Sequence, residues 1–83
     1  MVINHAKKRT AFVNGLLAAA LTCGVTKTDI KRKAFSSYAT GNRRIEHHND
    51  ELTLSDIFNI ATLCHLPPEQ LMTQAASNMA KAR

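Results

Sequence analysis

Residues 24–46 read GVTKTDIKRKAFSSYATGNRRIE and carry six of the eleven Lys and Arg residues of this 83-residue chain. Thr26, with Asp29 three residues later, is typical of a helix N-cap with an acidic first turn. Ser36 and Ser37 offer a second N-cap ahead of a polar, basic run. The stretch therefore predicts two short helices in succession, over residues 27–34 and from residue 36 or 37 to about 47.

A longer helix is predicted before this stretch, over residues 6–23. Its apolar positions recur at spacings of three and four: Phe12, Leu16, Ala19, Ala20 and Cys23. Gly15 lowers helix propensity inside it, which points to close packing by a neighbouring helix. Gly24 then ends the helix as a left-handed C-cap. Residues 1–5 are expected to be a flexible start.

Two more helices are predicted after the basic stretch. The first begins at Thr53 or Ser55, and its apolar face comprises Leu54, Ile57, Phe58, Ala61 and Cys64. Pro67 and Pro68 stop it and start the next, because proline is accepted in the first turn of a helix. The last helix has an apolar side of Leu71, Met72, Ala75, Ala76 and Met79. We expect its end, residues 74–83, either to form a dimer contact or to fray.

Composition supports an all-α fold, a compact five-helix domain covering residues 1–83. Hydrophobic residues make up 45% of the chain, but aromatic residues only 5%, and no β-type alternation is present. No run of about 18 apolar residues exists, so we expect no membrane span. Cys23 and Cys64 both fall at apolar helix positions. We expect reduced core thiols in a cytoplasmic protein, with a single disulfide as the alternative.

Charge is unevenly distributed along the chain. Residues 1–45 contain nine basic groups and only one acid, Asp29, whereas residues 46–83 contain five acids and two basic groups. The front part is therefore +8 and the back part −3. This asymmetry predicts a face that binds a polyanion on the N-terminal half. A solvated basic surface without a partner is the alternative.

Other classes of site lack support in the sequence. The acids are scattered, and the chain has neither a glycine-rich phosphate loop nor a nucleophile motif. His47 and His48 lie beside Asp50 and Glu51, but adjacent histidines do not face one way on a helix, and zinc-finger spacing is missing. We therefore expect no enzyme activity, no metal, no cofactor and no small-molecule substrate.

The order of these parts resembles the lambda-repressor-like helix-turn-helix family, which includes the phage repressor and Cro proteins. Residues 24–30 (GVTKTDI) are similar to the entry into the family's first motif helix, and residues 44–46 (RIE) to the end of its recognition helix. Residues 54–72 (LSDIFNIATLCHLPPEQLM) are similar to its C-terminal pattern. The resemblance covers about residues 10–73.

Two positions depart from the family pattern. Lys31 and Phe35 stand where the family has small residues that let the motif helices pack closely, and one extra residue lies between Ile30 and Asn42. We expect the backbone to adjust at residues 39–42, where Gly41 is a weak point of the helix. An alternative register would make residues 27–33 the recognition helix.

The resemblance implies a small transcriptional regulator of a phage or mobile element, a repressor that reads operator sequences in double-stranded DNA as a homodimer. The residues expected at the groove and its flanking phosphates are Ser36, Ser37, Tyr38, Thr40, Asn42, Arg43 and Arg44, with Lys27, His48 and Asn49 as further phosphate contacts. The expected dimer interface is Met72, Ala75, Ala76 and Met79. Alternatives are a module that binds another regulator or polymerase, and nonspecific nucleoid or RNA binding.

Overall fold

The computed structural model describes residues 3–81, and every regular element in that range is helical. In chain order these elements are α1 (Ala6–Thr22), α2 (Lys27–Lys33), α3 (Tyr38–Asn42), the π-helix η1 (Arg43–His47), the 3-10 helix η2 (Asn49–Glu51), α4 (Leu54–Leu63) and α5 (Pro68–Lys81). The predicted all-α, compact five-helix fold is confirmed. Residues 1–2 and 82–83, parts of the predicted flexible start and C-terminal segment, lie outside the described residues.

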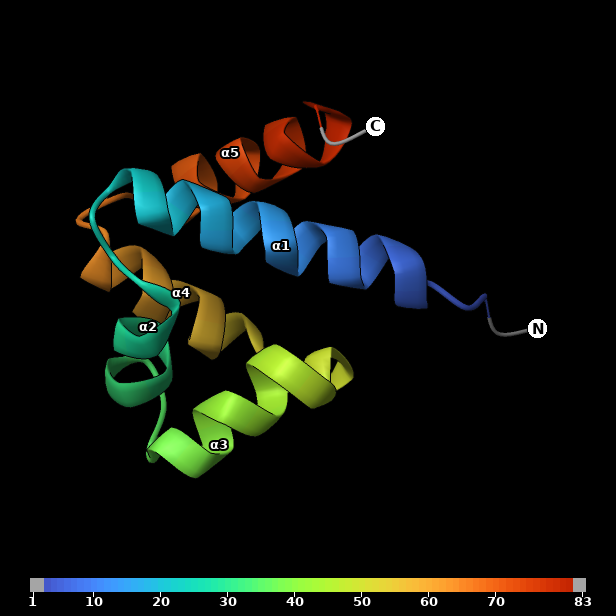
Figure 1. The fold of residues 1–83 in the computed structure, drawn as a ribbon. Helices are drawn as coiled ribbons and strands as arrows, with labels where there is room; N and C mark the ends of the chain where they lie inside the picture. Colours follow the sequence, from blue (N-terminus) through green and yellow to red (C-terminus); the bar gives the residue numbers. More distant parts are fainter. Residues whose placement is uncertain (1–2, 82–83) are drawn as a thin grey trace.

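The first and last helices form the largest contact of the fold. α1 and α5 lie side by side and run in opposite directions, with α4 beneath them and α2 and α3 at the far end (Figure 1). Gly15 makes this contact possible, since a Cβ there would lie 2.4 Å from the carbonyl oxygen of Ala75. The amide of Asn78 also donates to the Gly15 carbonyl at 3.0 Å. The predicted close packing at Gly15 is confirmed.

Two helices begin with the same side-chain device. In α2 the Thr26 hydroxyl accepts from the Asp29 N–H and the Asp29 carboxylate accepts from the Thr26 N–H, both at 3.1 Å. In α4, Thr53 and Asp56 make the same reciprocal pair. Each pair satisfies two N–H groups that a helix start leaves without partners. The predicted starts at Thr26 and Thr53 are confirmed.

α1 and α4 also end alike. Val25 donates to the Ala20 carbonyl at 2.9 Å, and Leu66 donates to the Ala61 carbonyl at 3.0 Å. In both motifs the residue in between has a left-handed backbone, Gly24 with φ 81° and His65 with φ 56°. These are the bonds of the Schellman motif, which satisfies the last carbonyls of a helix. The sequence predicted it at Gly24 but not at His65.

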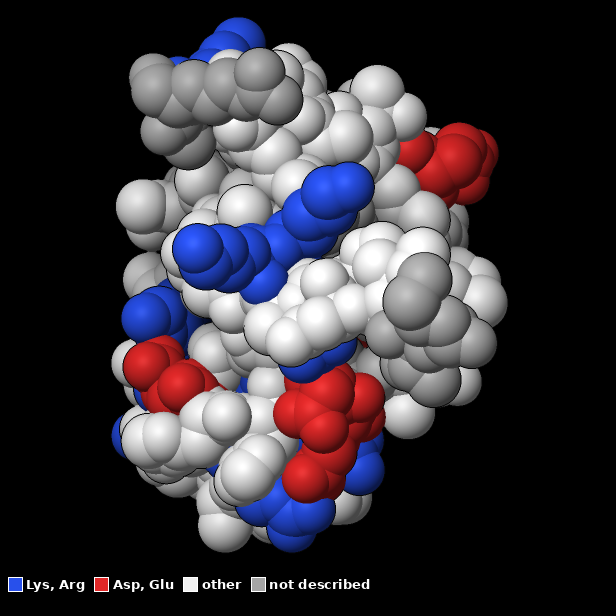
Figure 2. Space-filling view, turned by 90° about the vertical axis from the view of Figure 1, so that its right-hand side faces the viewer, with Lys and Arg blue, Asp and Glu red and all other residues white. Residues whose placement is uncertain are grey.

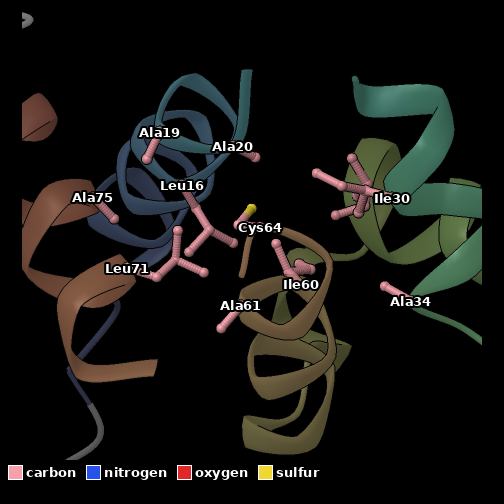
Figure 3. Packing of buried hydrophobic residues seen from close by; sticks show 11 residues of the cluster. Leu16, Ala19, Ala20, Ile30, Ala34, Ile60, Ala61, Cys64, Leu71 and Ala75 are labelled. Carbon is pink, nitrogen blue, oxygen red and sulfur yellow. The ribbon is translucent and has the colours of Figure 1, made fainter. Parts of the chain in front are cut away.

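The core is shared by α1, α2, α4, α5 and η1. Its largest fully buried side chains are Leu16, Ile30, Ile60 and Leu71, and they converge between the helices (Figure 3). The predicted apolar face of α4 is partly wrong: Leu54 and Phe58 are 58% and 43% exposed.

One of the buried positions of α4 is polar. Asp56 is buried and Leu54 is not, because the Asp56 carboxylate has partners in Thr53 and Arg44 that permit its burial. Ile60, Ala61 and Cys64 complete the buried face of α4 as predicted.

The third predicted helix changes its winding instead of breaking at Gly41. α3 is regular through Asn42, and the following residues wind as the wider π-helix η1. Gly41 is buried and serves as a contact point, since a Cβ there would lie 2.5 Å from the Lys31 carbonyl oxygen. The expected adjustment of the backbone at residues 39–42 is therefore wrong. The irregular winding lies after these residues, in η1.

The ends of the described chain also bear on two expectations. α5 is helical through Lys81, so residues 74–81 are not frayed. No single helix within residues 3–81 is long and apolar enough to cross a membrane, and α1 and α2, which together would be long enough, meet at 99°.

Candidate nucleic-acid interface

α2 and α3 form the element that the sequence predicts to read DNA. Residues 34–37 connect them, and Ser37 caps α3 by accepting from the Thr40 N–H at 3.2 Å. The Ser37 hydroxyl also bonds the Thr40 hydroxyl at 3.0 Å. Both residues thus have a local structural role at the start of α3, where Ser36 and Tyr38 are exposed.

Gly41 brings α3 against α2. Besides its approach to the Lys31 carbonyl, a Cβ at Gly41 would lie 2.8 Å from the Lys31 Cα and 2.9 Å from the Phe35 ring. The small residue needed for close helix packing is therefore on α3, opposite the positions where the resemblance places it. The space left by Gly41 therefore accommodates Lys31 on α2 and Phe35 in the connection that follows α2.

Arg43 and Arg44 have different surroundings although they are adjacent. Arg43 forms an ion pair with Glu51, and its side chain remains 61% exposed. Arg44 pairs with Asp56 at 3.0 Å, and the two side chains are 29% and 9% exposed. Since Asp56 is also part of the capping box of α4, Arg44 stabilises the fold, and its role in base reading stays a prediction.

Glu46 binds two lysines on the neighbouring helix. The ammonium groups of Lys27 and Lys31 lie 2.9 and 3.1 Å from its carboxylate. These two lysines lower the pKa of Glu46 below its ordinary value by hydrogen bonding and charge. Lys31 also lies 5.9 Å from the centre of the Tyr38 ring, within the range of a cation–π contact. Lys27, expected at a phosphate, thus shares one carboxylate with Lys31, and its side chain remains 51% exposed.

Asn49 is a capping residue. Its side-chain amide donates to the carbonyls of Arg44 and Ile45 at 2.6 and 2.9 Å, which satisfies the end of η1. Both donors of this amide are therefore used at the helix end, and the expected phosphate contact of Asn49 stays a prediction. His48 is exposed, and its ring nitrogen lies 3.9 Å from Glu51.

The residues that keep their polar groups available form a smaller set than the sequence suggests. Ser36 and Tyr38 are exposed, Asn42 is half-buried, and Arg43 is exposed beside Glu51. Sequence reasoning left Arg32 and Lys33 out of the candidate site, yet both are exposed at the end of α2. Helical spacing predicts their exposure, since Ile30 and Ala34 take the inward positions of α2 and its end.

Folding brings together charges that the sequence separates. Four cations of the front part pair with three acids of the back part: Lys27, Lys31, Arg43 and Arg44 with Glu46, Glu51 and Asp56. Within residues 3–81, the basic side chains outside such pairs are Lys7, Lys8, Arg9, Arg32, Lys33 and Lys81.

The surface reflects this division. On the face toward which α1 begins, blue side chains cross the middle without red ones against them, while red and blue lie in contact lower down, toward α3 (Figure 2). The expected polyanion-binding half is therefore mixed in charge around α3 and basic at the start of α1.

The residues expected at the dimer interface fall into a buried and an accessible group. Ala75 is fully buried against Gly15 within one chain, so its assignment to a dimer interface is corrected. Met72 and Met79 are half-buried, and Ala76 is exposed. These three residues leave part of α5 open to a partner.

Other kinds of site have little basis in the described part of the chain. No group of three or more His, Cys, Asp or Glu side chains within residues 3–81 is placed to hold a metal ion. One open hollow of about 480 Å³ is lined by residues 3–8 at the start of α1.

Comparison with known proteins adds no relative. The chain matches no protein-family model, no curated protein and no solved structure. The resemblance to lambda-repressor-like domains therefore rests on the residues quoted above.

Proposed function

We propose that the protein is a transcriptional regulator that binds specific sequences in double-stranded DNA, with α2 and α3 acting as a helix-turn-helix. The observation that carries this proposal is the placement of Arg43 and Tyr38. Both side chains project from the consecutive helical turns of α3 and η1, whose other face, Gly41 and Ile45, is buried against the domain. A short rigid helix with an exposed arginine is suited to the major groove.

Whether Glu51 prevents Arg43 from reading a base depends on the strength of their ion pair relative to that of an arginine–guanine contact. An exposed ion pair contributes at most about 1 kcal/mol. A bidentate arginine–guanine contact discriminates by about 1–3 kcal/mol. Arg43 can therefore exchange Glu51 for guanine at a net gain. Glu51 acts as a competitor that lowers affinity for DNA without abolishing it.

Arg32 and Lys33 supply the phosphate contacts in this proposal, with Ser36 and His48 at the margins. The two cations lie in the last turn of α2, next to the connection that leads into α3. Phosphate contacts position a reading helix and carry no sequence information. Homodimerisation through Met72, Ala76 and Met79 would present two copies of α3 to a palindrome.

The test is selection of random duplex DNA on the purified protein at about 150 mM salt. We expect a motif bound at least about 10³-fold more tightly than scrambled DNA. Arg43→Gln should lose this preference at one base pair. Lys81→Gln, which removes the same charge from α5, should keep it. Absence of any enriched motif would contradict the proposal.

A second pair of variants tests the competition at Glu51. Glu51→Gln frees Arg43, whereas Glu69→Gln removes the same charge from the start of α5. We expect Glu51→Gln to bind the selected site about 3–10-fold more tightly, an exchange worth roughly the 1 kcal/mol of an exposed pair, and to exceed Glu69→Gln clearly. Equal effects of the two variants would show that Glu51 does not restrain Arg43.

One observation favours the alternative of a protein partner. Three acids offset most of the charge of four cations around α3, and Tyr38, Leu54 and Phe58 are exposed apolar side chains on α3 and α4. Such a surface is less suited to phosphate and more suited to protein. Salt-labile DNA binding without a motif, together with capture of a regulator that Arg43→Gln does not affect, would support this alternative.

A further inference from the structure

The turns that follow α3 place an arginine, a histidine and a glutamate together. η1 is a π-helix, and at its end the His48 N–H donates to the Arg43 carbonyl at 2.7 Å. The next turn is the 3-10 helix η2, in which the Glu51 N–H donates to the His48 carbonyl at 3.0 Å. Two consecutive backbone hydrogen bonds therefore connect the three residues. Single π-turns of this kind are frequent at functional sites.

The Glu51 carboxylate has a different partner at each oxygen. Its Oε1 accepts from Nη2 of Arg43 in the ion pair described above. Its Oε2 lies 3.9 Å from Nδ1 of His48, which is too long for a hydrogen bond but within the range of an ion pair when the imidazole is charged. The exposed fractions of the three side chains are 61% for Arg43, 54% for His48 and 31% for Glu51. Because none of them is enclosed, they can exchange partners without a change in the fold.

The two cations of this cluster differ in chemistry. An arginine keeps its charge in proteins, whereas the charge of a histidine side chain changes between about pH 5 and 8. While the imidazole is neutral, Glu51 has Arg43 as its only ionic partner. When His48 takes up a proton, two cations share one carboxylate. Arg43 then leaves at a lower cost, because His48 continues to compensate the charge of Glu51.

We infer that His48 is a pH-dependent switch for Arg43: protonation of its imidazole lets Glu51 exchange Arg43 for His48 and makes Arg43 available to a guanine. This inference rests on the proposed function, in which Arg43 reads a base. The complex with DNA holds the His48 proton more firmly than the free protein does, because Arg43 no longer offsets Glu51 there. A complex that takes up protons binds more tightly as the pH falls.

Neighbouring charges leave this exchange to His48. The other charged or titratable groups on the elements packed here are Arg44, Glu46 and His47 of η1, Asp50 of η2 and the basic residues 7–9 of α1, which contacts η2. Arg44 pairs with α4 and Glu46 with α2. Within residues 3–81, Glu51 is the only acid within 4 Å of a His48 ring nitrogen. His47 and Asp50 are therefore matched controls, since they have the same chemical groups in the same turns without this contact.

The first experiment measures affinity for the selected DNA site by fluorescence anisotropy at about pH 8 and about pH 5.5, near the two ends of the histidine range. Scrambled DNA of the same length corrects for the general gain in positive charge. For the natural protein we expect the preference for the site to rise about 2–5-fold at the lower pH, the effect of an exposed ion pair. His48→Gln and Glu51→Gln should each abolish the rise, whereas His47→Gln and Asp50→Asn should keep it.

The Glu51 variant separates this switch from a direct phosphate contact of His48. A histidine that binds phosphate would keep its rise with falling pH in Glu51→Gln, and that result would overturn the inference. A site preference that does not change with pH in the natural protein would overturn it as well. Absence of any selected motif would contradict the proposed function itself, and with it the role of the cluster in reading DNA.

A second measurement needs no DNA. The carbon-13 chemical shift of the Glu51 carboxyl carbon responds to the charge beside it, so in the free natural protein it should change between the same two pH values. The change should disappear in His48→Gln and persist in His47→Gln. An unchanged response in His48→Gln would show that Glu51 does not sense His48, and would overturn the inference whether or not the protein binds DNA. A response that disappears as expected, without any selected motif, would place the failure in the proposed function.

Discussion

Two helix pairs of this protein approach each other through glycine, but different forces hold them together. α1 meets α5 at Gly15, and α2 meets α3 at Gly41. The α1–α5 pair is apolar, with Leu16, Leu71 and Ala75 fully buried around the contact. A single amide, that of Asn78, makes the one side-chain hydrogen bond between α1 and α5 within residues 3–81.

The α2–α3 side depends more on polar links. Ile30 and Ile45 are buried there, but Glu46 binds Lys27 and Lys31 across the two segments. Arg44 ties η1 to α4 through Asp56, and the Asn59 amide donates to the Ala34 carbonyl at 3.0 Å. Apolar packing involves no titrating group and no charge that salt can screen, whereas exposed ion pairs depend on both pH and ionic strength. The α1–α5 pair therefore gives the fold a stability that is independent of charge, whereas the stability of the α2–α3 side changes with pH and ionic strength.

The largest expected effect comes from breaking the glycine contact in the apolar pair. Gly15→Val places a Cβ where the Ala75 carbonyl oxygen now lies, and both groups belong to rigid helices. We expect a loss of about 3 kcal/mol or more in the free energy of unfolding, measured by urea denaturation. Asn14→Val is the matched control, since it makes a β-branched change at the exposed neighbouring position. Equal losses from both would show that helix propensity, and not the contact, is responsible.

The next effect separates the two neighbouring arginines of the polar side. Arg44→Met leaves the buried Asp56 carboxylate without its ion partner, and we expect a loss of about 2 kcal/mol. Arg43→Met removes an exposed pair with Glu51 and should cost less than about 0.5 kcal/mol. Thermal denaturation of both variants checks the difference. Similar melting temperatures would contradict the assignment of Arg44 to the fold.

A gain is expected at the end of α4. His65 adopts a left-handed backbone, φ 56°, that costs an L-residue about 1–2 kcal/mol and costs glycine little. His65→Gly should therefore stabilise the protein by about 1 kcal/mol and raise its melting temperature by roughly 4–8 °C. Gly24→Ala at the matching end of α1 should destabilise it by a similar amount. A loss from His65→Gly would show that the imidazole contributes more than its backbone costs.

The smallest effect is the acid sensitivity of the polar side. The folded pKa of Glu46 lies below its ordinary value of 4.5, so its stabilising effect is complete above that value and is lost as the pH falls through the folded pKa. Because the side chain is about a third exposed, the effect should stay below about 1 kcal/mol.

The hydrogen bonds that Asp29 accepts from Thr26 likewise hold the pKa of its carboxyl below the ordinary value, so its stabilising effect is also lost as the pH falls. Melting curves between pH 6 and 3 should show a smaller decline for Glu46→Gln than for the natural protein. Hydrogen exchange should rise first in α2 and η1 and last in α1 and α5. A uniform rise would contradict the difference between the two sides.

Local signals in the sequence predicted most of the secondary structure. Thr26 and Thr53 mark helix starts, Gly24 marks a helix end, and Pro67–Pro68 separate α4 from α5, because each acts on its own backbone or on residues within one turn. The π-helix η1 was not predicted. Nothing in its five residues distinguishes a wider turn from an ordinary one.

The candidate site was less predictable than the fold. Tyr38 on α3 and Arg43 at the start of η1 are exposed, but Arg44 and Asn49 are used inside the chain. Their partners are Asp56, twelve residues away, and the carbonyls at the end of η1. A side chain's reach is local, yet which distant acid comes within that reach depends on how the helices pack.

The sequence by itself therefore determined an all-helical chain, the positions of its helices and the glycine, Gly15, at which α1 touches another helix, whereas the contact at Gly41 came from the tertiary structure. Capping and helical periodicity are properties of short segments, which explains this success. Only the tertiary structure decided that Asp56 is buried in place of Leu54 and that Ala75 belongs to the core. It also cancelled much of the charge asymmetry, because folding places the acids of the back part beside the cations of the front part.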